Sequence, residues 1–115
     1  MSRRTRDEIL ADALEHFDLT LEYAENGDLR SQLTIDAICM RLSAGIEALA
    51  ALDPADREAL FGDDWAAMWG MRNRIAHGYL LVSAAIVRST VERDVPGIVA
   101  RIDSAGDRLA PNPVD

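Results

Sequence analysis

Apolar residues recur every three to four positions along almost the whole chain, which is the spacing of one face of an α-helix. No segment keeps the strict alternation of apolar and polar residues that a half-buried strand requires. The pattern therefore predicts an all-α fold, a four- to five-helix antiparallel bundle with short loops. A length of 115 residues suits a single domain with one modest core.

Start and stop signals divide the first half of the pattern into two helices. Thr5 and Glu8 have the spacing of a capping box, and Asn26-Gly27 is a typical helix stop. A second apolar stripe follows. The residues expected to be buried are Ile9, Leu10, Ala13, Leu14, Phe17, Leu21 and Ala24 in the first stripe, and Ile35, Ile38, Cys39, Leu42, Ile46 and Leu49 in the second.

The middle of the chain predicts a short helix and then a longer one. Asp53-Pro54 has the pattern of a cap followed by a proline in the first turn. Either Asp63 or Asp64 can cap the longer helix, and Gly78 is expected to weaken or end it. The apolar side of this helix is predicted to carry Trp65, Met68, Trp69, Ile75 and Ala76, with the two tryptophans packing in the core or in an interface.

The last helical stretch begins near Ser83 and carries Ile86, Val87 and Val91. Further on, Asp94-Val95-Pro96 indicates either a kink or the start of a new helix, with Ile98 and Ile102 continuing the apolar face. We therefore expect one helical domain over residues 1–104. The tail over residues 105–115 is expected to be flexible.

The charge and the length of the apolar runs exclude several classes of protein. No apolar run approaches the roughly 20 residues that span a bilayer, and no signal peptide is evident, so we expect a cytoplasmic protein with no membrane contact. The net charge of −8 argues against nonspecific nucleic-acid binding, which needs dense basic residues. It leaves room for a small local basic site. The single Cys39 is expected to be a buried, reduced thiol.

The segment MRNRIAHGY, residues 71–79, is the candidate site. Arg72 and His77 are five positions apart, which is about 140° around a straight helix, whereas Arg72 and Tyr79 lie nearly in line. The three groups converge only if the helix ends near Gly78 or if a second chain contributes. The spacing by itself favours an ordinary helix end, with surface arginines, a histidine at the helix C-terminus and a packed tyrosine.

These residue types suit one reaction. An arginine presents a planar fork of donors to phosphate, and a histidine moves protons near neutral pH. Together they suit cleavage of RNA, in which a 2′-hydroxyl attacks the neighbouring phosphate and no metal is required. The sequence contains no HExxH, CxxC or GxSxG motif and no Gly-rich phosphate loop, so no metal and no cofactor are expected.

The order Arg72-Asn73-Arg74-Ile75-Ala76-His77-Gly78-Tyr79, written R-N-x-x-x-H-x-Y, resembles the motif of the HEPN superfamily. The Gly-Tyr ending is similar to the HepT branch, the toxin half of HepT–MntA toxin–antitoxin pairs. The approach WAAMWGMRNRIAHGY and the later segment IVRSTVERDVPGIVARI also resemble that family. The resemblance extends roughly over residues 8–104.

The resemblance implies a helical bundle that forms a homodimer with the motifs of both chains facing one cleft. It implies a metal-independent endoribonuclease in which Arg72 binds and polarises the scissile phosphate. His77 would then transfer a proton or stabilise the transition state, and Asn73 would orient the site. Tyr79 corresponds to the tyrosine to which an MntA-like nucleotidyltransferase antitoxin adds AMP, and the added bulk and negative charge would keep RNA away.

The chain departs from the family pattern in two places. It reads LLVSAA after the motif tyrosine, where many members carry an acidic residue, and Gly45-Ile46-Glu47 where a Gly-Glu pair is common. The alternative function is a non-catalytic helical module that binds and regulates a nucleotidyltransferase. We interpret Glu47 as a structural or interface group, His16 as a surface residue, and Arg41 as part of a solvated face.

Overall fold

The computed structural model describes residues 4–78 and 82–109, and within these ranges it contains helices and no strand. In chain order the elements are α1 (Arg6–Asn26), α2 (Gln32–Leu49), α3 (Pro54–Phe61), α4 (Asp64–Ala76), α5 (Ala84–Ser89), the π-helical turn η2 (Thr90–Asp94) and α6 (Val95–Leu109). Because α5, η2 and α6 follow one another without a break, the described ranges hold five helical rods. The predicted all-α bundle is confirmed.

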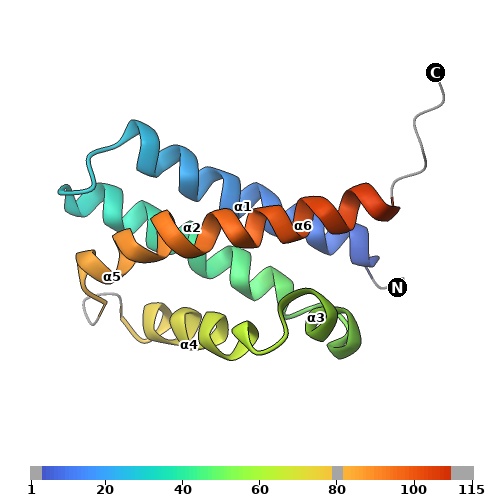
Figure 1. The fold of residues 1–115 in the computed structure, drawn as a ribbon. Coiled ribbons are helices and arrows are strands. Elements are labelled where there is room, and N and C mark those ends of the chain that lie inside the picture. Colours follow the sequence, from blue (N-terminus) through green and yellow to red (C-terminus); the bar gives the residue numbers. More distant parts are fainter. Residues whose placement is uncertain (1–3, 79–81, 110–115) are drawn as a thin grey trace, which may run out of the picture.

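The long helices α1, α2 and α6 form the body of the bundle, and α4 runs along another side of α2 (Figure 1). The α1 helix packs against both α2 and α6, whereas the main neighbour of α4 is α2. The short α3 connects α2 to α4 and contacts α6. In the described part of the chain, no helix is both long enough and apolar enough to cross a membrane.

The ends of α1 are those that the sequence predicts. The Thr5 hydroxyl accepts a hydrogen bond from the Glu8 backbone N–H at 3.1 Å, and the Glu8 carboxylate accepts one from the Thr5 N–H at 3.3 Å. This reciprocal pair satisfies two N–H groups that a helix start leaves open. The helix ends at Asn26, and Gly27 caps it with an N–H donated to the Tyr23 carbonyl. The predicted capping box and stop are confirmed.

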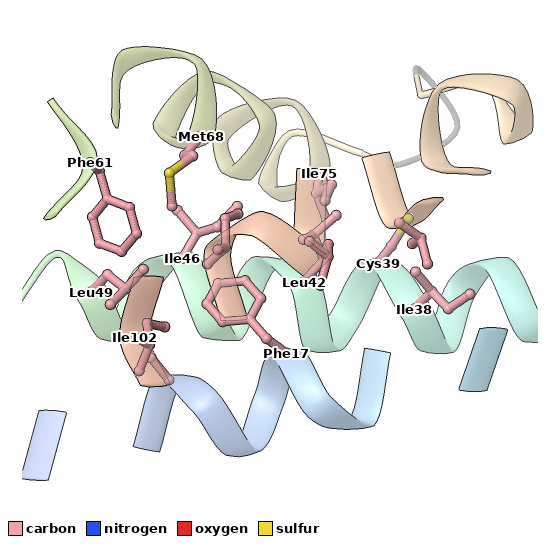
Figure 2. Close-up of a cluster of buried hydrophobic side chains, with 14 of the residues drawn as sticks. Phe17, Ile38, Cys39, Leu42, Ile46, Leu49, Phe61, Met68, Ile75 and Ile102 are labelled. Carbon is pink, nitrogen blue, oxygen red and sulfur yellow. The ribbon is translucent and has the colours of Figure 1, made fainter. Parts of the chain in front are cut away.

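The core lies where α2 meets α1, α4 and α6, and Figure 2 shows buried side chains from all four helices. All six stripe residues of α2 are buried, and Phe17 of α1 is fully buried beside them. A Cβ placed on Gly45 would lie 2.9 Å from the Phe17 ring, so a glycine is needed for this close helix contact. Cys39 is buried as predicted, and desolvation, with the charge of Asp36 adding to it, raises the pKa of its thiol to about 11.

Leu14, Leu21 and Ala24 of the α1 stripe are partly buried against the core rather than fully buried, and three other side chains differ more from the prediction. Ala76 is exposed because it is the last residue of α4, and Ile86 is 42% exposed because the short α5 turns Val87 toward the core instead. The interpretation of His16 as a surface residue is wrong, since its side chain is only 23% exposed. It is covered because Arg41 of α2 reaches across to it from the neighbouring helix.

At Pro96 the helical rod continues through a π turn, without a break that would start a separate helix. Proline has no N–H, so Pro96 cannot donate to the Glu92 carbonyl four residues earlier. A wider π turn forms at this point, in which the Val95 N–H donates a hydrogen bond to the Thr90 carbonyl. The boundary expected at residue 104 falls inside α6, where Ala105 is 1% exposed. The tail from residue 110 lies outside the described residues.

Candidate active site

The motif occupies the last turns of α4 and its C-terminal cap. Helical hydrogen bonding continues as far as His77, whose backbone N–H donates to the Asn73 carbonyl at 3.0 Å. The next residue, Gly78, has φ of 124°, a backbone conformation that side chains with a Cβ rarely adopt. The predicted helix end at Gly78 is confirmed.

The position of this helix end decides how Arg72 and His77 relate to each other. The break comes after both residues, so the rotation of about 140° between them is retained. In the described part of the chain no hydrogen bond joins their side chains. The helix end therefore does not bring the two groups together within one chain, and an extended substrate or a second chain has to connect them.

The guanidinium of Arg72 is held on three sides. It lies over the Trp69 ring at 4.8 Å, its Nη1 donates to Asn73 Oδ1 at 3.2 Å, and its Nη2 donates to Glu47 Oε1 at 3.2 Å. Its Nε is buried and has no hydrogen-bond partner among the residues that the structure describes. Buried polar atoms without a partner are rare in folded proteins and call for an explanation at each position where they occur.

A column of stacked side chains along α4 fixes the place of Arg72. The rings of Trp65 and Trp69 stack with centroids 5.7 Å apart, and Arg57 covers the other end of the column at 4.9 Å from Trp65. Spacings of four and three residues put Trp65, Trp69 and Arg72 on one side of the helix. The predicted packing role of the tryptophans is thus accompanied by a second role, the support of an arginine.

Glu47 is the site neighbour whose role the sequence did not reveal. It comes from α2, and its ion pair with Arg72 joins the two helices. The Glu47 side chain is 60% exposed, against 25% for Arg72. Exposed ion pairs of this kind contribute about 1 kcal/mol or less, so an incoming anion can replace Glu47 at little cost. The Gly45-Ile46-Glu47 triplet is the sequence signal that could have indicated this position of Glu47. Gly45 faces the core, and a residue two positions later points to the opposite side of the helix.

His77 and Tyr79 complete the predicted set. The His77 side chain is exposed, and its imidazole makes no hydrogen bond to any residue that the structure describes. Its access to solvent suits a group that meets a substrate. Tyr79 lies outside the described residues, so its predicted role stays a prediction.

A second histidine–arginine pair lies between α1 and α2. Arg41 Nη1 is 3.2 Å from His16 Nδ1, and the other ring nitrogen is 3.9 Å from an Asp12 carboxylate oxygen. Arg41 therefore pairs with His16 rather than standing free on a solvated face. Among the residues described, no group of three or more His, Cys, Asp and Glu side chains is arranged to hold a metal ion.

Comparison with known proteins places the chain in a family. The model of a family described as "Ribonuclease HepT-like" matches residues 10–105. The chain belongs to the HepT-like ribonuclease family. No curated protein and no solved structure matches it. In this HepT-like chain the matched range includes the whole 72–79 segment, the supporting tryptophans and Glu47.

Proposed function

We propose that this chain is a metal-independent endoribonuclease, the toxin of a HepT/MntA-type toxin–antitoxin module in the cytoplasm. The observation that carries the proposal is the setting of Arg72. The guanidinium is half-buried over Trp69, and its Nη2 is held only by a contact with the exposed Glu47 that an anion can replace. The residue occupies the motif position of a chain from a ribonuclease family. Such a group is prepared to receive a phosphate.

In the proposed reaction the 2′-hydroxyl of an RNA nucleotide attacks the adjacent phosphorus, and the bond to the 5′-oxygen of the next nucleotide breaks. The phosphate replaces the Glu47 carboxylate on the Arg72 guanidinium. Arg72 then holds the phosphate, whose negative charge increases in the transition state. His77 moves a proton at the attacking or the leaving oxygen, or stabilises the transition state. Asn73 supports Arg72 through its Oδ1 and keeps the guanidinium plane oriented.

The direct test is cleavage of an end-labelled RNA by the purified chain in the presence of a chelator. A metal-independent ribonuclease retains its activity under these conditions. Absence of cleavage by the wild-type chain contradicts the enzymatic proposal. If a chain that cleaves no RNA still binds a nucleotidyltransferase, the result supports the alternative function, a non-catalytic interaction module.

Tyr79 is the proposed site of inactivation by the cognate MntA-like nucleotidyltransferase. Incubation with that enzyme and ATP is expected to add the mass of one or more AMP units to the chain and to abolish RNA cleavage, because AMP brings bulk and negative charge beside a phosphate-binding site. Intact-mass spectrometry measures the addition. Tyr79→Phe removes the acceptor oxygen and serves as the matched variant. A mass increase that persists in Tyr79→Phe contradicts this assignment.

We also infer that two copies associate through the outward face of α2. Leu33 is 80% exposed and Met40 is 67% exposed, and their spacing of seven residues puts them on one side of the helix. Glu47 lies another seven residues along the same side and pairs with Arg72. A second copy on this face covers both apolar side chains next to the Arg72 site. It also offers a way for the motifs of two chains to share one cleft.

Met40→Glu tests this interface. A charge placed in an apolar contact is expected to raise the dimer dissociation constant by about 30-fold or more, the equivalent of about 2 kcal/mol. Analytical ultracentrifugation over a range of concentrations measures the change. Ala100→Glu on the exposed side of α6 is the control and should leave association unchanged. Equal dissociation constants for Met40→Glu and the wild type reject α2 as the contact face.

A further inference from the structure

A groove lies between α4 and the η2–α6 segment, on a different side of α4 from the Arg72–Glu47 pair. Its volume is about 530 Å³, and the buried side chains of Leu42 and Ile46 from α2 form part of its lining. The walls hold small residues. A Cβ added to Gly70 of α4 or Gly97 of α6 would meet nothing within 4 Å, so the space at these positions is open.

The groove lining carries one more basic than acidic side chain, on a chain whose net charge is −8. Its lining includes three arginines, Arg74, Arg93 and Arg101, together with Asp64 and Asp94. Arg101 is already paired with Asp64 at 2.8 Å. By contrast, Arg74 and Arg93 make no ion pair or hydrogen bond with any residue in the described ranges, although the chain carries 20 acidic residues.

The π turn helps to form this groove. The turn, residues 90–94, contributes Thr90, Arg93 and Asp94 to the lining. It exists because Pro96 interrupts regular helical bonding, and π turns within helices are frequent at functional sites. The turn thus places an unpaired guanidinium opposite α4, where Arg74 supplies a second one.

The groove also adjoins the candidate active site. Arg74 precedes His77 by three residues, and residues three apart are neighbours on a helix surface. The volume of about 530 Å³ is within the range of about 300–1,000 Å³ typical of small-ligand sites. It therefore has room for an extended nucleotide segment but not for a duplex. Guanidinium groups that make no ion pair within the described ranges suit the phosphates of such a segment.

We propose that the groove between α4 and α6 binds the backbone of single-stranded RNA next to the cleavage site, with Arg74 and Arg93 contacting phosphates. This inference rests on the proposed ribonuclease function and extends it by naming the residues that hold the substrate beyond the scissile bond. These two arginines are binding residues and take no part in proton transfer.

The test measures binding separately from cleavage. A fluorescent single-stranded 2′-O-methyl RNA lacks the attacking hydroxyl, so the wild-type chain can bind it but cannot cleave it by the proposed route. Fluorescence anisotropy at several salt concentrations gives the affinity and its salt dependence. For Arg74→Gln combined with Arg93→Gln, we expect about 10-fold weaker binding and a salt slope smaller by about 1.4, since each phosphate contact to a single strand contributes about 0.7.

Matched variants separate the groove from general charge and from folding. Arg30→Gln removes another exposed arginine, which lies outside the groove, and should leave binding unchanged. Gly70→Leu fills the groove without removing charge and should weaken binding, whereas Gly106→Leu, at another open helical glycine outside the groove, should not. With a cleavable RNA, the arginine variants should raise KM and preserve kcat.

The outcomes distinguish this inference from the proposed function. If the wild type cleaves RNA but the double arginine variant binds it with unchanged affinity and salt slope, the groove proposal is overturned and the function stands. If these variants weaken association between protein chains while RNA affinity stays the same, the groove is a protein contact and the proposal is again overturned. A wild-type chain that cleaves no RNA contradicts the proposed function, whatever the binding result.

Discussion

His77→Ala is expected to reduce RNA cleavage by about 100-fold or more, the loss typical when a group that transfers protons is removed. The His77 side chain is exposed and makes no hydrogen bond in the described structure, so its removal should change the free energy of unfolding by less than about 0.5 kcal/mol. The measurement is the single-turnover rate on a labelled RNA at saturating protein, with thermal unfolding followed in parallel.

The second histidine of the chain provides the control for this experiment. His16 packs between α1 and α2 and contacts Arg41 on another part of the bundle. His16→Gln keeps a side chain that can hydrogen-bond to Arg41 and should leave the cleavage rate within about twofold of the wild type, as expected of a residue that takes no part in the chemistry. A rate for His77→Ala equal to that of the wild type would remove His77 from the mechanism.

Arg72→Lys is expected to lower the cleavage rate by about 100-fold, almost as much as Arg72→Ala. Lysine retains the positive charge but lacks the planar fork that lies over Trp69 while donating to Asn73 and Glu47. The rate of cleavage at saturating RNA measures the effect, because the geometry of the phosphate contact matters most in the transition state.

Arg57→Gln is the matched control for Arg72→Lys. Arg57 covers Trp65 at the opposite end of the same aromatic column, at nearly the same distance from its ring. Its loss should lower stability, since it also donates to two backbone carbonyls, but cleavage by the folded fraction should be unchanged. Full cleavage by Arg72→Lys would show that charge alone suffices and that the oriented fork is unnecessary.

The helices of this protein were largely predictable because their signals are local. The capping box at Thr5 and Glu8, the stop at Gly27 and the break at Gly78 each depend on hydrogen bonds or dihedral angles within a few residues. The apolar stripes of α1 and α2 were also correct, because the side of a helix that is buried follows from its period. The predictions for Ala76 and Ile86 were wrong because Ala76 is the last residue of its own helix and the short α5 turns Val87 to the core instead of Ile86.

The candidate site was predictable only in part. Family resemblance singled out Arg72, Asn73, His77 and Tyr79, and the match over residues 10–105 confirms the family. Their roles remain proposals. The position of Glu47 against Arg72 depends on how α2 and α4 pack, and these residues are 25 positions apart in the chain. A pattern of neighbouring residues cannot predict a contact between residues so far apart in the chain.

The sequence by itself determined the helices, their ends, the buried stripes and the family motif, because periodicity and capping are properties of neighbouring residues. The tertiary structure decided what surrounds the motif. It brought Glu47 of α2 to the Arg72 guanidinium of α4. It also opened a groove with two arginines that make no ion pair or hydrogen bond within the described ranges. These features come from the packing of helices far apart in the chain, which local sequence patterns do not specify.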